Sequence, residues 1–183
     1  MTEVSDKKVA ILATHGFEQS ELEVPQQKLK ESGATVHVVS LKPGTIRGWD
    51  HTDWGNDVGV DAVLDEVEAA DYDALVLPGG VINPDSLRTE PKAIEFIKAF
   101  HEAGKPIAAI CHGPWLLAEA DLLQGRRVTS YPSIQTDVKN AGGQWSDEEV
   151  VIDNTLITSR KPDDLEAFCD CIEEALADAA RAA

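Results

Sequence analysis

The chain has 183 residues and a mass of 19.8 kDa, and 43% of its residues are hydrophobic while 27% are charged. These values are typical of a globular domain with its own core, and they exclude a collagen, a coiled coil and a disulfide-stabilised scaffold. Sixteen Lys and Arg against thirty-three Asp and Glu give a formal net charge of −17. Because this charge repels polyanions, we expect neither nucleic acid nor an anionic membrane surface as a partner.

Cysteine usage and the first residues predict a cytoplasmic protein. The chain has three cysteines, Cys111, Cys169 and Cys171, an odd number without the spacing of a disulfide framework. The N-terminal residues are polar, so they lack the apolar segment of a signal peptide, and no run approaches the roughly 18 apolar residues of a membrane span. Free thiols of this kind are typical of a reducing compartment.

Short apolar runs alternate with amphipathic helical patterns along the chain, which predicts a parallel sheet covered by helices. In chain order we expect a strand at 9–13, a helix at 18–32, a strand at 36–41, a turn-rich segment at 43–61 that suits a short hairpin, a strand at 74–77, a helix from 91 to about 104, a strand at 107–110, a helix after 114, a hairpin at 150–157 and a last helix from about 162. No linker or repeat interrupts this order. We therefore expect residues 1–183 to form a single domain, with 1–7 as a flexible N-terminus.

Three loops that follow predicted strands carry residues able to do chemistry. They are 15–18 after the first strand, 78–80 after the strand at 74–77, and 111–113 after the strand at 107–110. Ligands of open parallel sheets bind outside the carboxyl ends of the strands. If these strands are neighbours in the sheet, the three loops converge on one cleft.

Cys111 lies between an apolar strand and the start of a helix, the position of the nucleophile in a strand–turn–helix elbow. Gly113 would relieve crowding in that turn, and Pro114 suits the first turn of the helix. We expect the N–H groups at the helix start to favour the thiolate and to lower the pKa of Cys111 below the free value of about 8.5. The alternative is a buried cysteine that behaves as a small hydrophobic residue.

His112, Glu18, Gly79 and Gly80 are the candidate partners of this thiol. His112 could be its base, although neighbouring side chains project differently and a histidine base needs a third group to orient it; otherwise it is a packed side chain. Glu18 could be a carboxyl beside the sulfur, with a raised pKa, or a carboxylate on a helix dipole. Gly79 and Gly80 could donate backbone N–H groups to an oxyanion, or only form a turn.

The remaining candidates predict neither a metal site nor a cofactor site. His37, His51 and His101 show no recognised metal-ligand spacing. Trp49 and Trp54 could line a pocket or an interface, but we favour packing in an exposed turn. We therefore expect no metal and no cofactor.

Several motifs in order resemble those of the DJ-1/PfpI superfamily, and especially its PfpI (intracellular protease I) branch. They are THGFEQSE at 14–21, LPGG at 77–80, AICHGP at 109–114, TSYP at 129–132, DVKNAG at 137–142 and TSRKPDDL at 158–165. The resemblance implies a flavodoxin-like, three-layer α/β sandwich with a mainly parallel central sheet. It also implies that Cys111 is the elbow nucleophile, Glu18 its carboxyl partner and His112 the base.

The resemblance further implies a homo-oligomer, a dimer or higher, in which an acidic residue of a neighbouring subunit orients His112. The family places this acid in a Pro-Glu or Pro-Asp pair shortly after the Gly-Gly turn. Pro84-Asp85 matches that pair, with one additional residue among 81–83. Asp85 is therefore the expected acid.

The implied function is that of a cytosolic stress-response enzyme whose cysteine acts on reactive aldehydes or on glycated adducts, as a glyoxalase or deglycase. Its partner would be a small-molecule aldehyde or a glycated substrate. Two alternatives remain at this point. One is a redox-sensing or protective protein in which oxidation of Cys111 is the event and turnover is small, and the other is a cysteine peptidase of the PfpI type.

Overall fold

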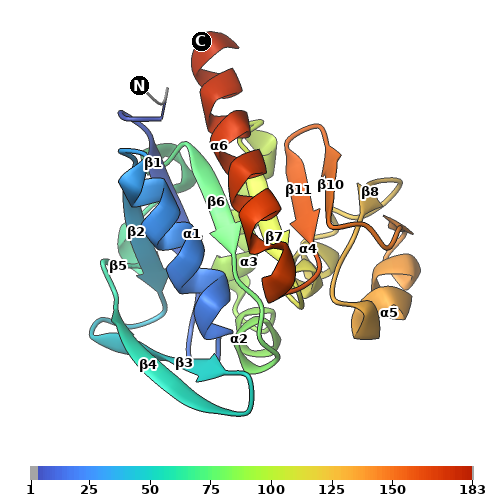
Figure 1. Cartoon of the computed structure of the whole chain (residues 1–183), viewed down its shortest axis with the longest axis horizontal. Coiled ribbons are helices and arrows are strands. Elements are labelled where there is room, and N and C mark those ends of the chain that lie inside the picture. Colours follow the sequence, from blue (N-terminus) through green and yellow to red (C-terminus); the bar gives the residue numbers. More distant parts are fainter. Residues whose placement is uncertain (1–3, 183) are drawn as a thin grey trace.

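A seven-stranded sheet forms the centre of the protein, which a computed structural model describes from residue 4 to residue 182, with side chains to residue 179 (Figure 1). Its strand order is β10-β11-β7-β6-β1-β2-β5, and only the β10–β11 pair is antiparallel. The strands are β1 (Lys8–Leu12), β2 (Thr35–Ser40), β5 (Ala62–Val63), β6 (Ala74–Leu77), β7 (Ile107–Ile110), β10 (Val150–Asp153) and β11 (Leu156–Ser159). The predicted flavodoxin-like α/β fold with a mainly parallel sheet is confirmed.

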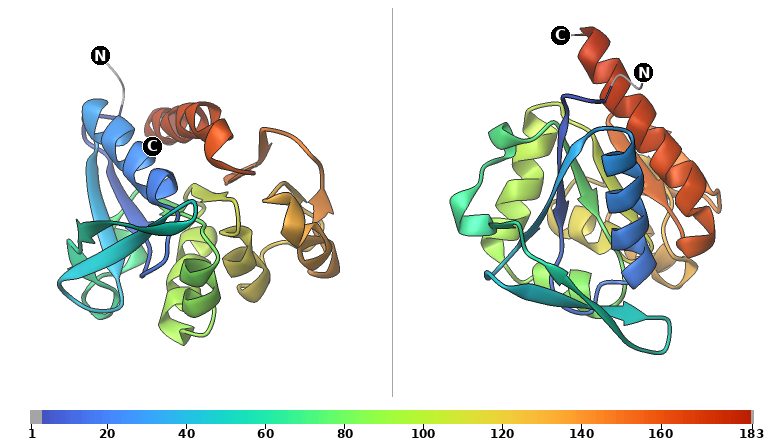
Figure 2. Two further views of the ribbon diagram at one scale, coloured as in Figure 1. Left: turned by 60° about the horizontal axis from the view of Figure 1, so that its bottom comes forward. Right: turned by 60° about the vertical axis from the view of Figure 1, so that its left-hand side comes forward.

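Helices cover both faces of this sheet (Figure 2). One face packs against α1 (Gln19–Glu31) and α6 (Leu165–Ala182). The other packs against α3 (Pro91–Glu102), with the shorter α2 (Ile82–Leu87) and α4 (Pro114–Glu119) beside it. The central strands are buried on both sides, which explains why they are continuous apolar runs.

Strand β1 shows how the two layers of core arise. Val9 and Ile11 belong to the core under α1 and α6, whereas Ala10 and Leu12 belong to the core under α3. Successive side chains of a strand point to opposite faces, so one short apolar run supplies both cores.

Two hairpins lie at the predicted positions. The turn-rich segment contains β3 (Thr45–Asp50) and β4 (Asp53–Gly59), which pair antiparallel. The segment at 150–157 forms the β10–β11 hairpin, and Asn154 in its turn has a φ of 54°. An Asn tolerates this left-handed conformation better than most residues.

The segment after α4 adds smaller elements at one end of the sheet. It contains β8 (Arg127–Val128), which pairs in parallel with β9 (Gln144–Trp145), and the short helix α5 (Gln135–Asn140). Within residues 4–182 there are also four 3₁₀ turns: Leu64–Glu66, Ala69–Asp71, Pro132–Ile134 and Pro162–Asp164.

The N-terminal segment differs from the expectation of a flexible stretch at 1–7. Residues 1–3 lie outside the described residues, but Val4 is only 1% exposed and Lys7 forms an ion pair with Asp73 at 3.4 Å. Burial of the Val4 side chain and the Lys7–Asp73 ion pair both favour an ordered segment from residue 4 onward. The assignment of 1–183 to a single domain stays a prediction. Among residues 4–182, no helix has both the length and the apolar character needed to cross a membrane.

Candidate active site

Cys111 follows β7 directly and has a φ of 63°, a left-handed conformation that costs free energy in a residue with a side chain. The turn is so tight that a Cβ on Gly113 would lie 2.6 Å from the carbonyl oxygen of Leu77 and 2.8 Å from that of Ile110. Pro114 then begins α4. The strand–turn–helix elbow predicted from the sequence is therefore present, with Cys111 at its apex.

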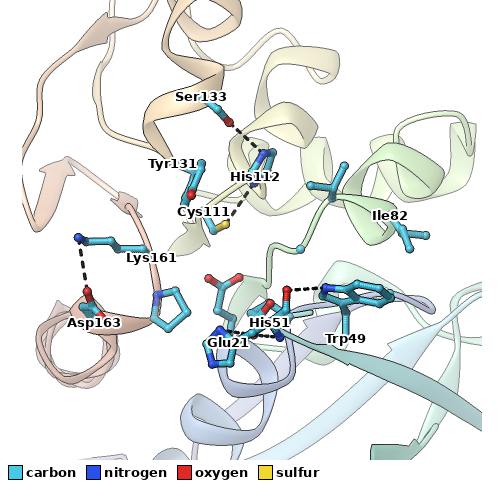
Figure 3. A pocket seen from close by; sticks show the side chains of 15 residues that line it. Glu21, Trp49, His51, Ile82, Cys111, His112, Tyr131, Ser133, Lys161 and Asp163 are labelled. Carbon is cyan, nitrogen blue, oxygen red and sulfur yellow. Dashed lines mark hydrogen bonds and ion pairs between the residues drawn. The ribbon is translucent and has the colours of Figure 1, made fainter. Parts of the chain in front are cut away.

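A cavity of about 690 Å³ opens at the carboxyl ends of β1, β6 and β7 (Figure 3). Each of the three predicted loops contributes to its lining, through residues such as Glu18, Gly80 and Cys111. Trp49 of the β3–β4 hairpin and Tyr131 add aromatic walls. The loops converge because β1, β6 and β7 are adjacent in the sheet.

The carboxyl beside the sulfur belongs to Glu21, and not to Glu18 as expected. Glu21 is fully buried, and its Oε1 accepts the Gly79 N–H at 3.0 Å. Its carboxyl lies beside Cys111, because a Cβ on Gly79 would be 2.6 Å from both Oε1 of Glu21 and Cβ of Cys111. Glu18 lines the same cavity, but its Oε1 accepts the backbone N–H of His51 at 3.4 Å. Side chains in a helix lean toward its N-terminus, so the residue inside the first turn of α1 reaches back to the elbow, whereas the one before the helix points to the hairpin.

Burial controls the protonation states of Glu21 and Cys111. Burial, together with the nearby Glu18 carboxylate, raises the pKa of Glu21 to about 8, so Glu21 is mostly protonated at neutral pH. Burial also raises the pKa of the Cys111 thiol, and a charge on Glu21 adds to that effect. The N–H groups of Gly80 and His112 act in the opposite direction but are outweighed. The expectation of a lowered thiol pKa was wrong, because it neglected desolvation; the thiol needs a base.

His112 lies in contact with that thiol despite being its neighbour in sequence. Its Nδ1 is 3.2 Å from Sγ of Cys111, and its Nε2 is 3.2 Å from Oγ of Ser133. The ring stacks on Tyr131, and Trp115 meets it edge-on, each with ring centroids 5.0 Å apart. Burial lowers the pKa of His112, so the ring is neutral at pH 7 and able to accept a proton.

The two glycines of the Gly-Gly turn have different partners. The N–H of Gly79 donates to Oε1 of Glu21. A Cβ at Gly79 would lie 2.6 Å from Cβ of Cys111. Gly80 has a φ of 74°, and its backbone N–H lowers the pKa of both Cys111 and Glu21. Of the two expected oxyanion donors, Gly80 is the one whose N–H acts on the Cys111 thiol, and its role toward an oxyanion stays a prediction.

Other candidates lie outside this centre or on its rim. Asp85 is exposed on α2 and is not part of the cavity lining of its own chain. Trp49 lines the cavity, while Trp54 is 42% exposed and packs edge-on against the Trp49 ring. His51 also lines the cavity, although nothing in its sequence context distinguished it from an ordinary turn residue.

Glu18, Asp50 and His51 form one group that could hold a metal ion, since one ligand atom from each lies within 4.8 Å of the others. Asp50 and His51 are exposed. Exposed acidic groups of this kind are common without a bound ion, so the group identifies no metal centre.

The chain is similar to known proteins in both sequence and fold. Residues 7–175 match the DJ-1/PfpI family. Deglycase TK1284 of Thermococcus kodakarensis is 47% identical over 161 residues, which cover 88% of this chain and 94% of that protein. General stress protein 18 of Bacillus subtilis is 44% identical over 164 residues, which cover 88% of this chain and 93% of that protein. A two-domain protein of Anabaena variabilis, with DJ-1/ThiJ/PfpI-like and ferritin-like domains, superposes with a TM-score of 0.89 at 38% identity, over 93% of this chain and 48% of that one.

Proposed function

The chain belongs to the DJ-1/PfpI family, and from this membership and the geometry of the site we propose that it is a cysteine-dependent enzyme acting on reactive aldehydes or their adducts with amines. One observation carries the proposal. The buried thiol of Cys111 lies 3.2 Å from a neutral imidazole, that of His112, and beside a protonated carboxyl, that of Glu21. A thiol with a proton acceptor and a proton donor can both attack a carbonyl and protonate its oxygen.

The first step forms a bond between Sγ of Cys111 and the aldehyde carbon. The thiol proton passes to Nδ1 of His112, and the carbonyl oxygen takes a proton from Glu21, which gives a hemithioacetal. With an amine adduct, the carbon–nitrogen bond breaks as the sulfur–carbon bond forms, and His112 returns the proton to the leaving amine. The same intermediate results, and the amine is restored.

The second step converts the intermediate of a 1,2-dicarbonyl compound into a hydroxy acid. The hydrogen on the sulfur-bearing carbon leaves as a proton, and a proton is added to the neighbouring carbonyl carbon. The first carbon is thereby oxidised, and the second is reduced. The product is a thioester on Cys111, which water hydrolyses to the free acid and the thiol. No external oxidant is required, and Glu21 and His112 carry the protons.

The shape of the cavity favours small substrates. Its volume of about 690 Å³ and its walls, which include Trp49, Ile82 and Tyr131, suit a small aldehyde or one modified side chain. A peptidase would need an extended groove for several residues of a substrate. The similarity to General stress protein 18 supports a role in the response to stress.

We also propose a homo-oligomer in the cytoplasm. Three free cysteines support a reducing compartment. Val81, Ile82 and Tyr131 line the cavity and are 55%, 42% and 39% exposed, so its rim is apolar and suits a protein contact. Since Asp85 lies outside the cavity of its own chain, it could act on His112 only from a second copy.

The first test is lactate formation from methylglyoxal without glutathione, together with amine release from a methylglyoxal–amine adduct. We expect Cys111→Ser to lower both rates by about a thousand-fold or more, because the nucleophile is removed. Cys171→Ser, which changes a half-buried cysteine on α6, is the matched control and should behave as the native chain.

Absence of both products with the native chain would refute the proposal. Treatment with mild peroxide would then test the redox-sensing alternative, which requires mass additions confined to Cys111. Equal turnover by the native chain and Cys111→Ser would place any activity outside this site.

A further inference from the structure

We propose that Ser133 is the positioning residue of His112: its hydroxyl accepts the Nε2–H of the ring and thereby keeps the Nδ1 lone pair directed at the thiol of Cys111. The inference rests on the proposed role of His112 as the base. It adds a residue of the same chain to a site whose expected orienting group was Asp85 of another copy.

The two nitrogens of His112 have one partner each. Nδ1 lies 3.2 Å from Sγ of Cys111, and Nε2 lies 3.2 Å from Oγ of Ser133 (Figure 3). A neutral imidazole carries one ring proton, and its position follows from the hydrogen bond of the other nitrogen. With the proton on Nε2, Nδ1 is free to accept the thiol proton; with the proton on Nδ1, no lone pair faces the sulfur.

Ser133 also suits the state formed after proton transfer. The imidazolium then has two N–H donors, one directed at the thiolate of Cys111 and one at the hydroxyl oxygen of Ser133. Both find an acceptor without any movement of the ring. A serine hydroxyl can accept the Nε2–H in the neutral and in the charged state of His112, so it supports the base throughout the reaction.

The segment that carries Ser133 is tied to the elbow itself. The backbone N–H of Tyr131 donates to the carbonyl oxygen of Cys111 at 2.8 Å, and the Tyr131 ring stacks on His112. Trp115 meets the ring edge-on and donates its own Nε1–H to Asp137 at 2.9 Å. These contacts place the ring but leave the choice of protonated nitrogen to Ser133.

This role is compatible with an oligomer. A hydroxyl that accepts the Nε2–H retains its own hydrogen and can donate it to a further acceptor. A carboxylate such as Asp85 of a second copy could therefore bind Ser133 while Ser133 binds His112. The two contributions can be separated by experiment.

The test compares Ser133→Ala, Ser133→Thr and the native chain, with Ser86→Ala, an exposed serine on α2, as the matched control. We measure kcat and KM for methylglyoxal and record the ring nitrogens of ¹⁵N-labelled His112 by NMR, which distinguishes protonated from unprotonated nitrogens. In Ser133→Ala we expect kcat to fall by up to about ten-fold with KM little changed, as for the loss of one neutral hydrogen bond.

The NMR signals should show a shift of the His112 proton toward Nδ1 in Ser133→Ala. Ser133→Thr, which retains the hydroxyl, should restore both kcat and the native tautomer, and Ser86→Ala should match the native chain. A native kcat and tautomer in Ser133→Ala would overturn the inference, and so would a lower kcat with the tautomer unchanged.

The outcomes also distinguish failure of the inference from failure of the proposed function. If the native chain makes no product from aldehydes or adducts, the proposed function fails, but the tautomer of His112 in the Ser133 variants still decides the role of Ser133. If the native chain is active and the tautomer does not respond to Ser133, only the inference fails.

Discussion

In the proposed reaction three side chains exchange protons, and burial keeps each of them uncharged at rest. It raises the pKa of Cys111, raises that of Glu21 to about 8 and lowers that of His112. An uncharged site avoids the cost of burying ions in a largely apolar cavity. In the proposed reaction, charge develops when the thiol proton moves to His112, whose Nε2 already lies 3.2 Å from Oγ of Ser133.

The protonated Glu21 makes the stability of the fold depend on pH. Its pKa of about 8 lies above the unfolded value of 4.5, so between these pH values the folded state binds a proton that the unfolded state lacks. The free energy of unfolding therefore falls as pH rises through this window, by up to about 5 kcal/mol in total. Glu21→Gln cannot ionise, and we expect its stability to change less from pH 5 to pH 8.

Urea unfolding at several pH values measures this difference. Glu31→Gln, which changes an exposed residue of the same helix, is the control and should keep the pH dependence of the native chain. Parallel stability curves for Glu21→Gln and the native chain would contradict the assignment of a raised pKa to Glu21.

At the scale of elements, the loop after β6 and the start of α1 approach so closely that no side chain fits between them. A Cβ on Gly80 would lie 2.4 Å from the carbonyl oxygen of Gly16 and 2.7 Å from the N of Glu18. Gly80 also has a positive φ of 74°. This glycine therefore lets the two loops meet in the wall of the cavity that Cys111 also lines.

We expect Gly80→Ala to destabilise the protein more than Gly104→Ala. Both glycines have positive φ, 74° and 67°, so both variants incur about 1–2 kcal/mol of backbone strain. A Cβ on Gly104 meets nothing within 4 Å, whereas the clash at Gly80 adds about 1–3 kcal/mol. Thermal unfolding measures the difference. Equal losses of stability in the two variants would contradict this expectation, because they would show that the two loops can move apart without further destabilising the protein.

At the scale of the whole molecule, a net charge of −17 opposes self-association, so any contact between copies must use surface of another kind. The exposed apolar side chains Val81, Ile82 and Tyr131 gather at the cavity, which is also where an acid from a second copy would act. Assembly and catalysis are therefore expected to depend on the same rim.

Asp85→Asn tests that dependence. If Asp85 of a second copy supports His112, we expect turnover to fall by about ten- to a hundred-fold, as for a hydrogen bond to a charged group, while alkylation of Cys111 continues. Asp6→Asn, an exposed acid near the N-terminus, is the control. Sedimentation gives the oligomeric state, and unchanged turnover in Asp85→Asn would remove this residue from the site.

Features that depend on short stretches of chain could be predicted from the sequence. The apolar runs at 74–77 and 107–110 coincide with β6 and β7, because a strand buried on both faces has few polar positions. The elbow at Cys111 was recognisable for a similar reason: a strand end, a glycine and a helix-starting proline are all local signals. These signals, with the motifs around them, also identified the family.

Features that depend on distances across the chain were decided only by the tertiary structure. Glu18 and Glu21 are both acids near the start of α1, and only the packing of that helix shows which one meets the sulfur. Ser133 contacts a histidine 21 positions earlier in the chain, and no spacing rule marks such a pair. The protonation of Cys111, Glu21 and His112 follows from burial, which is set by every element packed around them and by no local pattern.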